Sequence, residues 1–333
     1  MSYDSKIMLR ARARYDEAKD RRESELRARR RRCYAQQPRI EEIDRELSRT
    51  MAKIIANGLR SGADTHTAIA AIRTENLRLQ RERGELLREL GYSPDYLEDK
   101  PACPLCGDTG WIKNTMCKCL QRCYIREQNA ELSRMLNLGS QSFDTFDINY
   151  YSDTETFGRK KTARENMERV SDICMEFAHH FPSRVKNLLL TGDPGLGKTF
   201  LSACIAREVS EKGFSVYYDT AIHVFSRFEK NKFSRDRQEE EDESAAQDVE
   251  RVLRCDLLIL DDLGTELASS FIESTFYQII NKRLQDEKST IISTNLNPQE
   301  LGNRYGAAAF SRIRGEYTFL PFFGEDIRIL KKR

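Results

Sequence analysis

The segment Gly192–Thr199 constrains the fold of this chain more than any other feature of its sequence. It reads G-D-P-G-L-G-K-T and matches the phosphate-binding loop pattern G-x-x-x-x-G-K-[ST] completely. The apolar run Leu188–Leu190 precedes it, and the helix-forming run Phe200–Ala206 follows it. A strand, a glycine-rich loop and a helix in this order predict the first unit of a parallel sheet that is covered by helices.

The residues of this loop suit a nucleoside triphosphate held together with Mg2+. Glycines let the backbone wrap so that successive N–H groups point at phosphate oxygens, and the N-terminus of the following helix adds a partial positive charge. We expect Lys198 to contact the β- and γ-phosphates during catalysis and Thr199 to offer its hydroxyl to Mg2+. The residues predicted to bind ATP are Gly192, Asp193, Pro194, Gly195, Leu196, Gly197, Lys198 and Thr199.

Two further apolar runs end in polar side chains. Leu257–Leu260 leads directly into Asp261 and Asp262, and Thr290–Thr294 leads into Asn295. On the model of a parallel sheet, these ends lie beside the phosphate loop. We expect Asp261 to hold Mg2+, Asp262 to polarise the attacking water as a general base, and Asn295 to hydrogen-bond the γ-phosphate or that water.

The C-terminal part of the chain alternates between short apolar runs and helical patterns. This alternation predicts an α/β core with a parallel five-stranded sheet over residues 186–333, after a connector and lead-in over residues 126–185. The predicted strands are Leu188–Thr191, Ser215–Tyr218, Leu257–Leu260, Thr290–Ser293 and Tyr317–Phe322.

The N-terminal part has a different character. Residues 1–38 are rich in arginine and predict a helical or flexible basic arm, which either contacts nucleic acid or is a solvated helix of mixed charge. Residues 39–98 predict a helical hairpin or short coiled coil, whose apolar stripe packs internally or binds a partner. The stripe positions are Ile40, Ile43, Leu47, Met51 and Ile54 on one helix and Ile69, Ile72, Leu79, Leu86 and Leu90 on the other.

Five of the nine cysteines lie between residues 103 and 123. The pairs Cys103-x2-Cys106 and Cys117-x-Cys119 predict a small zinc-binding module over residues 99–125, because four thiolates suit a tetrahedral structural Zn2+. Cys123 is an alternative to Cys117 or Cys119, since Cys-x-Cys is tighter than the usual spacing. Five free cysteines and an iron–sulfur cluster are the less favoured alternatives.

No apolar run is long enough to span a bilayer, and the N-terminus has no apolar core typical of a secretion signal. These features predict a cytoplasmic protein without a membrane partner. In such a reducing compartment, clustered cysteines favour a metal site over disulfides.

Taken in order, these motifs resemble those of AAA+ ATPases and, within them, bacterial replicative helicase loaders of the DnaC/DnaI family, which share an IstB-like ATP-binding core. The resemblance covers roughly residues 101–333. It implies an ATPase that loads the replicative DNA helicase onto single-stranded DNA, with the N-terminal module gripping the helicase and ATP acting as a switch. The segments that carry it are residues 103–110, 143–147, 192–199, 257–264, 292–296, 310–313 and 324–328.

The resemblance also implies roles for single residues. Arg312 matches an arginine finger that reaches the ATP of a neighbouring subunit, which implies self-association, and Arg328 matches a second arginine that acts on its own subunit's nucleotide. Relatives often carry another arginine where this chain has Ala308. Most of the wider superfamily has glutamate where this chain has Asp262, and Glu266 is a less favoured substitute.

In loaders, the segment that corresponds to residues 220–248 lines the DNA-facing side. Here it interleaves cations with aromatic rings, the combination that single-stranded DNA-binding proteins use, although the rings can instead belong to the core. The residues are Phe225, Arg227, Phe228, Lys230, Lys232, Phe233, Arg235 and Arg237.

Two other functions fit the same motifs. An IstB-type transposition helper ATPase would share the core but bind duplex DNA and a transposase. A nucleotide-sensing adaptor would bind ATP and barely hydrolyse it, which the short Asp262 side chain makes credible.

Overall fold

The structure, a computed structural model, describes residues 3–58, 64–136, 141–182, 187–233 and 239–332. The chain divides into two compact units, Ala13–Cys119 and Met1–Arg12 with Leu120–Arg333. Helix α1 (Ser5–Gln36) therefore begins in the second of these units and continues in the first.

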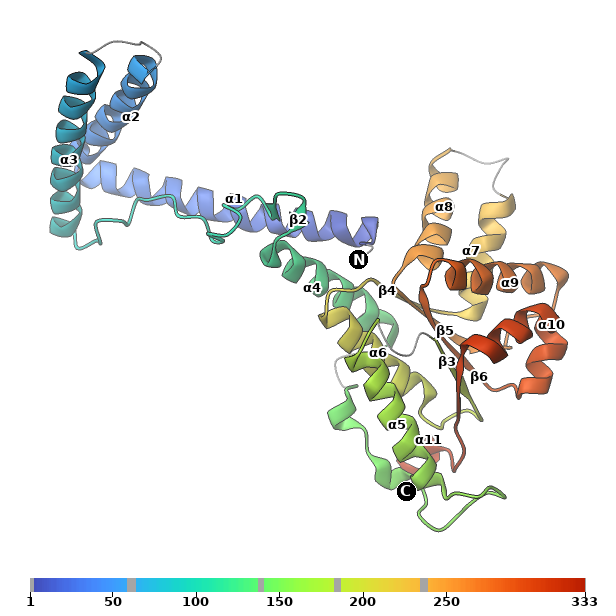
Figure 1. The fold of residues 1–333 in the computed structure, drawn as a ribbon. Coiled ribbons are helices and arrows are strands. Elements are labelled where there is room, and N and C mark those ends of the chain that lie inside the picture. Colours follow the sequence, from blue (N-terminus) through green and yellow to red (C-terminus); the bar gives the residue numbers. More distant parts are fainter. Residues whose placement is uncertain (1–2, 59–63, 137–140, 183–186, 234–238, 333) are drawn as a thin grey trace. The chain divides into compact units, whose positions relative to one another are not determined.

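The larger unit is built on a parallel sheet of five strands in the order β4-β5-β6-β3-β7 (Figure 1). Each of the five predicted runs overlaps one of these strands, so the predicted parallel sheet is confirmed. The strands are β3 (Asn187–Thr191), β4 (Val216–Thr220), β5 (Leu257–Leu263), β6 (Ser289–Thr294) and β7 (Thr318–Pro321).

Helices cover both faces of this sheet, because successive side chains of a strand point to opposite faces. In β3, Leu188 and Leu190 pack in one apolar cluster with α5 (Ala163–His179) and α6 (Lys198–Glu211). Leu189 packs in the other cluster, against the helices that follow β4, β5 and β6. Those helices are α7 (Ala221–Phe233), α8 (Glu239–Arg254), α9 (Ser270–Gln285) and α10 (Pro298–Glu316).

Short elements border the sheet and position the site described below. Two 3-10 turns, η1 (Phe143–Thr145) and η2 (Ile148–Tyr150), lead into α5, and the short helix α11 (Ile327–Leu330) follows β7. Helix α4 (Lys118–Leu136) contributes Leu132 and Leu136 to the same apolar cluster as α5 and α6.

The smaller unit contains the predicted hairpin of α2 (Pro38–Gly58) and α3 (Asp64–Glu89). Arg39 pairs with Glu82 and Thr50 with Asn76, which is an antiparallel register. From the predicted stripe, buried Ile40 packs in a cluster with Cys33 of α1, Leu87 and Leu97, and Leu86 and Leu90 pack against that cluster. At these positions the stripe is internal packing; Met51, Ile54 and Ile69 have side chains outside the described set.

The arginine-rich N-terminal segment is a helix for most of its length, and several of its cations are paired. Within the larger unit, Lys6 pairs with Asp248 and Arg10 with Glu131. Within the smaller unit, the guanidinium of Arg29 lies 5.4 Å from the ring centroid of Tyr96. These contacts favour the helix of mixed charge over a free basic arm. In the described part of the chain, no helix is both long enough and apolar enough to cross a membrane.

Candidate functional site

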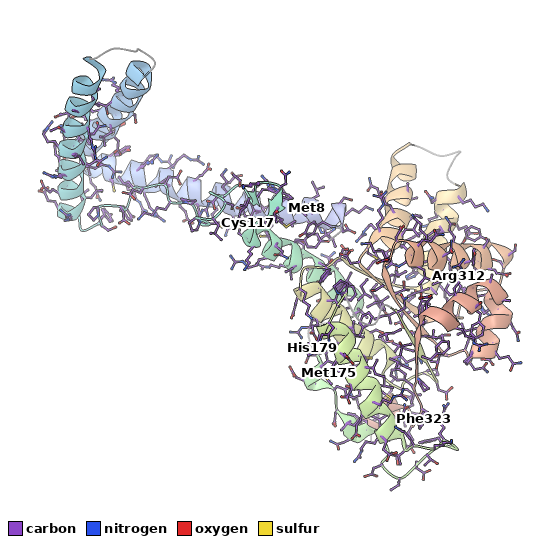
Figure 2. The ribbon with its side chains drawn as sticks, viewed as in Figure 1. Met8, Cys117, Met175, His179, Arg312 and Phe323 are labelled. Carbon is purple, nitrogen blue, oxygen red and sulfur yellow. The ribbon has the colours of Figure 1, made fainter. Side chains whose placement is uncertain are left out.

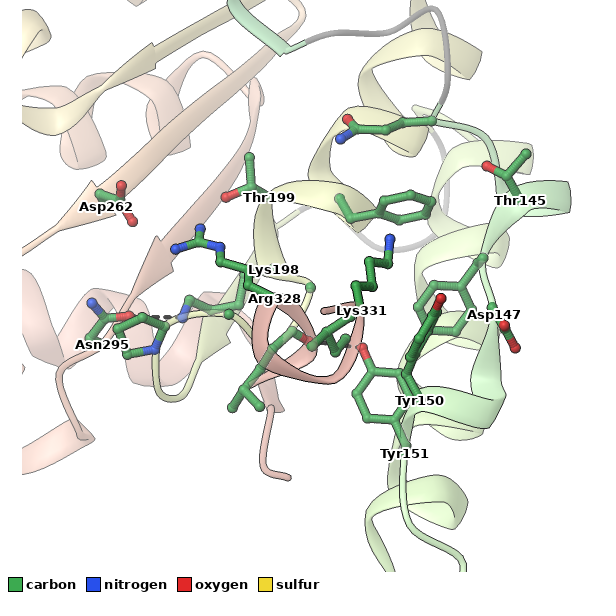
Figure 3. Close-up of a pocket in the computed structure, with 18 of the residues that line it drawn as sticks. Thr145, Asp147, Tyr150, Tyr151, Lys198, Thr199, Asp262, Asn295, Arg328 and Lys331 are labelled. Carbon is green, nitrogen blue, oxygen red and sulfur yellow. Dashed lines mark hydrogen bonds between the residues drawn. The ribbon is translucent and has the colours of Figure 1, made fainter. Parts of the chain in front are cut away.

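The polar residues predicted from three separate motifs meet at one edge of the sheet. Strand β3 pairs with β6, and β6 with β5, so the carboxyl ends of all three strands are adjacent. A cavity of about 520 Å3 opens there. Its lining includes Pro194–Phe200, Asp262, Asn295 and Arg328 (Figure 3).

The phosphate loop connects β3 to α6 and needs glycine at several positions. Gly197, the residue before α6, has φ +91°, a left-handed conformation that side chains other than glycine rarely adopt. Two contacts from outside hold the loop: the Tyr151 hydroxyl donates to the Leu196 carbonyl (2.9 Å), and the Ile327 N–H donates to the Gly195 carbonyl (3.0 Å). The loop is therefore fixed by the lead-in segment and by α11.

Lys198 is buried at the centre of the site, with 5% of its surface exposed. Its ammonium group donates to the carbonyls of Gly192 (2.5 Å) and Asp193 (2.8 Å) and to Oδ1 of Asn295 (2.8 Å), the last drawn as a dashed line in Figure 3. Burial lowers the pKa of Lys198, and the carboxylates of Asp262, Asp261 and Asp193 oppose that shift. Lys198 and Asn295, predicted from different motifs, are thus direct partners.

Asp261 ends the regular part of β5 and is 2% exposed. Its Oδ2 accepts hydrogen bonds from the Thr199 hydroxyl (3.1 Å) and the Tyr218 hydroxyl (2.6 Å), and its Oδ1 accepts one from Ser293. The hydroxyl and the carboxylate that were predicted to share Mg2+ are therefore adjacent. Oxygen ligands of this kind are those that Mg2+ prefers.

Asp262 follows Asp261 but points into the cavity and is solvent-exposed. Its N–H donates to Oδ1 of Asp261 and to the Ser293 hydroxyl, both at 3.1 Å, and its φ of +52° turns the chain at this point. Burial, and next the charge of Asp261, raise the pKa of Asp262 above its usual value, while Lys198 and Arg328 act in the opposite direction.

Glu266, the alternative base, makes hydrogen bonds outside the cavity. It is 6% exposed and does not line the cavity. Its carboxylate accepts hydrogen bonds from the Gly264 N–H (3.0 Å), from Arg304 (3.3 Å) and from the Tyr305 hydroxyl. The geometry favours Asp262 over Glu266 as the group that faces a nucleotide.

The sequence motifs did not predict the wall of the cavity opposite the strands. Aromatic and aliphatic side chains form it, from the lead-in segment (Phe146, Tyr150, Tyr151) and from α11 (Ile327). Gln141 also lines it, and its buried side-chain oxygen accepts no hydrogen bond from any residue that the structure describes. In the sequence, residues 143–147 were noted only as a segment that resembles the loader family, and that resemblance assigned no role to their side chains.

Comparison with known proteins agrees with this geometry. The family described as IstB-like ATP binding protein matches residues 159–313, the stretch that holds the phosphate loop, Asp261, Asp262 and Asn295. Residues 159–313 are therefore similar to an IstB-like ATP-binding domain.

Curated proteins similar to this chain are replicative helicase loaders. The loader DnaC of Escherichia coli (strain K12) is 27% identical over 151 residues, 45% of this chain and 59% of DnaC. The loader DnaI of Bacillus subtilis (strain 168) is 30% identical over 123 residues, 36% of this chain and 36% of DnaI. The chain therefore spans about three fifths of the length of the DnaC relative that it matches.

Among solved structures, the DnaC helicase loader has a TM-score of 0.45 and 24% identity, covering 56% of this chain and 99% of that one. The structure of DnaI gives 0.42 and 22%, covering 57% and 92%. The resemblance to DnaC/DnaI loaders is confirmed, and so is the predicted five-stranded parallel sheet in a chain that also has a helical hairpin and a four-cysteine cluster.

The two arginines that the resemblance singled out lie in different places. Arg328 of α11 lines the cavity and acts electrostatically on Lys198 and Asp262. Arg312 projects from the exposed side of α10 (Figure 2), outside that cavity. Its guanidinium lies 5.6 Å from the ring centroid of Tyr277 on α9, with a 3.4 Å contact to the Tyr277 hydroxyl.

The predicted DNA-contact segment is only partly available as a surface. Phe225 and Phe228 are buried in the core of the IstB-like domain, so the alternative reading of these rings as core residues holds. Arg227 pairs with Asp219 (2.7 Å) and Asp248 (3.3 Å). Lys230 and Lys232 on α7 are exposed. Arg235, Arg237 and the side chain of Phe233 lie outside the described residues.

The cysteine cluster belongs to the smaller unit. The Sγ atoms of Cys103, Cys106, Cys117 and Cys119 all lie within 4.8 Å of one another (Cys117 is labelled in Figure 2). A short hairpin of β1 (Trp111–Ile112) and β2 (Thr115–Met116) brings the two pairs together. Cys123 is outside this group of four and packs instead in the apolar cluster around Tyr124.

Proposed function

We propose that this chain is an ATP-dependent loader of the replicative DNA helicase. The observation that carries this proposal is the similarity of its ATP-binding half to proteins named replicative helicase loaders, in a chain that also places a four-cysteine module before that half. The helicase would be bound by the three N-terminal regions, residues 1–38, 39–98 and 99–125. Residues 126–185 would connect these regions to the ATPase core at 186–333.

The cavity supplies the parts that ATP binding needs. The loop amides and Lys198 face the phosphates, and the wall of Phe146, Tyr150 and Ile327 suits the base. The unpartnered oxygen of Gln141 suits the amino group of adenine, because a glutamine amide pairs well with the adenine edge and poorly with guanine. Thr199 and Asp261 would hold Mg2+, which would neutralise part of the charge of the phosphates.

Hydrolysis follows from the position of Asp262. A water oxygen attacks the γ-phosphorus, the bond from that phosphorus to the leaving ADP oxygen breaks, and the Asp262 carboxylate takes the proton of the water. Lys198, Asn295 and Arg328 stabilise and orient the γ-phosphate. Asp262 is shorter than a glutamate, so we infer slow hydrolysis that depends on assembly.

Arg312 supports self-association through the ATPase domain. It is exposed, lies outside its own cavity, and Tyr277 holds it in place. An arginine presented in this way suits the ATP of a neighbouring copy, where a cation stabilises the charge that develops on the transferred phosphoryl group. Single-stranded DNA would contact the exposed lysines of α7, Lys230 and Lys232.

The four cysteines fit a structural Zn2+. Tetrahedral zinc with Zn–S bonds of 2.3 Å places its sulfurs about 3.8 Å apart. The distances from Cys103 Sγ to Cys117 Sγ and from Cys106 Sγ to Cys119 Sγ are 3.7 and 3.4 Å. With four protein ligands the metal keeps no open position, so its role would be to fold the module.

Co-purification tests the loader proposal. The full chain and the Lys198→Ala variant, both tagged, are mixed with the host replicative helicase, with and without ATP. We expect the wild-type chain to retain the helicase and its response to ATP to disappear in the variant. Helicase that does not bind under either condition defeats the proposal.

The name of the matching family favours a second candidate, the IstB-type transposition helper ATPase. That protein would bind duplex DNA and a transposase. Recovery of a transposase without helicase, together with preference for duplex over single-stranded DNA, supports it. A third candidate, an adaptor that binds ATP without hydrolysing it, is supported if phosphate release never exceeds that of Lys198→Ala, with or without single-stranded DNA.

A further inference from the structure

A tyrosine far from the cysteine motif in the sequence lies against the sulfur cluster. The hydroxyl of Tyr15 on α1 is 3.8 Å from Sγ of Cys106 and 3.6 Å from Sγ of Cys119. Both distances are within the range of hydrogen bonds to sulfur. Tyr15 precedes these cysteines by 91 and 104 residues, so cysteine spacing gives no indication of its role.

A second contact joins the same helix to the cysteine loop. Arg22, two turns beyond Tyr15 on α1, donates to the carboxylate of Asp108. That carboxylate also accepts hydrogen bonds from the N–H groups of Ala102 (3.0 Å) and Cys103 (2.9 Å). Tyr15 thus contacts the sulfurs themselves, while Arg22 contacts the Asp108 carboxylate, which in turn accepts hydrogen bonds from the backbone at the first cysteine. Both contacts lie within the unit Ala13–Cys119.

We propose that Tyr15 is an outer-sphere residue of the metal centre, donating its hydroxyl hydrogen to the metal-bound thiolates of Cys106 and Cys119. The proposal rests on the zinc site of the proposed function. A thiol can donate or accept, but a metal-bound thiolate only accepts, so the direction of the hydrogen bond is set when the metal binds. A hydrogen bond to an ionised acceptor is about twice as strong as one between neutral groups.

Metal binding and docking of α1 are therefore linked. Because the Tyr15 hydrogen bond is stronger with the metal present, it raises metal affinity, and the metal in turn favours the docked position of α1 by the same free energy. Loss of the metal then loosens α1 around Tyr15 as well as the loop that carries the cysteines. Residues that orient metal ligands in this way typically change metal affinity 10–100-fold when they are replaced.

Tyr15→Phe tests the proposal, because it keeps the ring and removes only the hydroxyl. Tyr34→Phe is the matched control. Tyr34 lies on the same helix, and its hydroxyl donates a hydrogen bond to Asp44 at 2.7 Å rather than to a sulfur of the four-cysteine cluster. Zinc affinity of the full chain is measured by competition with a chromophoric chelator. The Co2+-substituted proteins are compared by their sulfur-to-cobalt charge-transfer absorption.

We expect Tyr15→Phe to bind zinc 10–100-fold more weakly and to shift the charge-transfer band, while Tyr34→Phe matches the wild type in both. A purely structural role for Tyr15 would leave the band in place. We also expect removal of the metal to speed amide hydrogen exchange around Tyr15–Arg22 in the wild type.

Three negative results are distinguishable. A wild-type protein without the absorption of a four-thiolate cobalt site overturns the metal site and this inference with it. A normal wild-type spectrum together with an unchanged affinity and band in Tyr15→Phe overturns only the role of Tyr15. Hydrogen exchange of α1 that does not respond to the metal overturns the linkage.

Discussion

Replacing Asp262 with asparagine separates nucleotide binding from hydrolysis. Asparagine has the shape of aspartate but cannot take a proton from water. The N–H of residue 262 still donates to Asp261 and Ser293, both at 3.1 Å, so the β5 turn and the Mg2+ oxygens keep their places. The phosphate contacts from Lys198 and the loop are also unchanged. The substitution therefore removes the proposed base alone.

The expected size of the effect follows from these contacts. A positioned general base contributes about 10²–10⁴-fold to a rate, or about 3–5 kcal/mol of barrier. ATP affinity should stay the same or rise a few-fold, because a negative charge beside the phosphates is lost. Solvent around the exposed Asp262 screens that charge, which keeps the gain small.

Single-turnover phosphate release and binding of a fluorescent ATP analogue measure the two effects separately. The pH dependence adds an independent check. As a general base, Asp262 would act in its ionised form, and its partial desolvation in the cavity and the charge of Asp261 raise its pKa. Acidification should therefore slow the wild-type enzyme at a higher pH than an ordinary aspartate would require, and this step should be missing from the residual rate of Asp262→Asn.

The reasoning is refuted if Asp262→Asn releases phosphate within about threefold of the wild-type rate, far less than a general base supplies. It is also refuted if the variant loses ATP binding, because Asp262 would then hold the nucleotide or Mg2+. Asp262→Glu gives the complementary test. Its longer side chain should speed hydrolysis if the reach of Asp262 limits the wild-type rate.

Four other outcomes are expected. Lys198→Ala should lose binding of the fluorescent ATP analogue, because a buried ammonium that faces the phosphates is removed. Gln141→Ala should narrow the preference for ATP over GTP in competition binding by up to about 10-fold, the value of one net hydrogen bond of about 0.5–1.5 kcal/mol; an unchanged ratio would mean that Gln141 does not contact the base. Arg312→Ala should keep ATP binding but lose assembly-dependent turnover; lost binding would mean that the finger is misplaced. Chelation of the metal should expose residues 101–123 to proteolysis while the thermal transition of the ATPase core stays in place; joint melting would contradict independent units.

The sheet and the phosphate end of the site were predictable because local patterns encode them. Continuous apolar runs such as Leu257–Leu260 are typical of strands buried on both faces, and all five runs proved to be strands. A loop between a strand and a helix, with Gly197 at positive φ, has few alternative structures. Once the strands were in order, the chemistry of parallel sheets placed Asp261 and Asn295 beside Lys198.

The remaining features depend on contacts between distant segments. The wall of the cavity needs Tyr150 and Ile327, which are far apart in the sequence, to meet over the loop. Phe225 and Phe228 read equally well as DNA-stacking rings or core residues until the packing of α7 was known. Tyr15 reaches the cysteines only because α1 and the cysteine loop, which are far apart in the sequence, pack against each other. No short pattern contains information of this kind.

Glu266 shows how one segment serves two purposes. It lies in the loop after β5, four residues beyond Asp262, and a sequence can offer either carboxylate as the base. In the structure its buried carboxylate joins the Gly264 N–H to Arg304 and Tyr305 of α10, the helix that also carries Arg312. Burial of the Glu266 carboxylate without these partners would cost several kcal/mol, so the contacts hold α10 to the loop beside the cavity. The same loop therefore presents Asp262 to the cavity and fixes the helix that carries Arg312, the residue that we propose acts on a neighbouring copy.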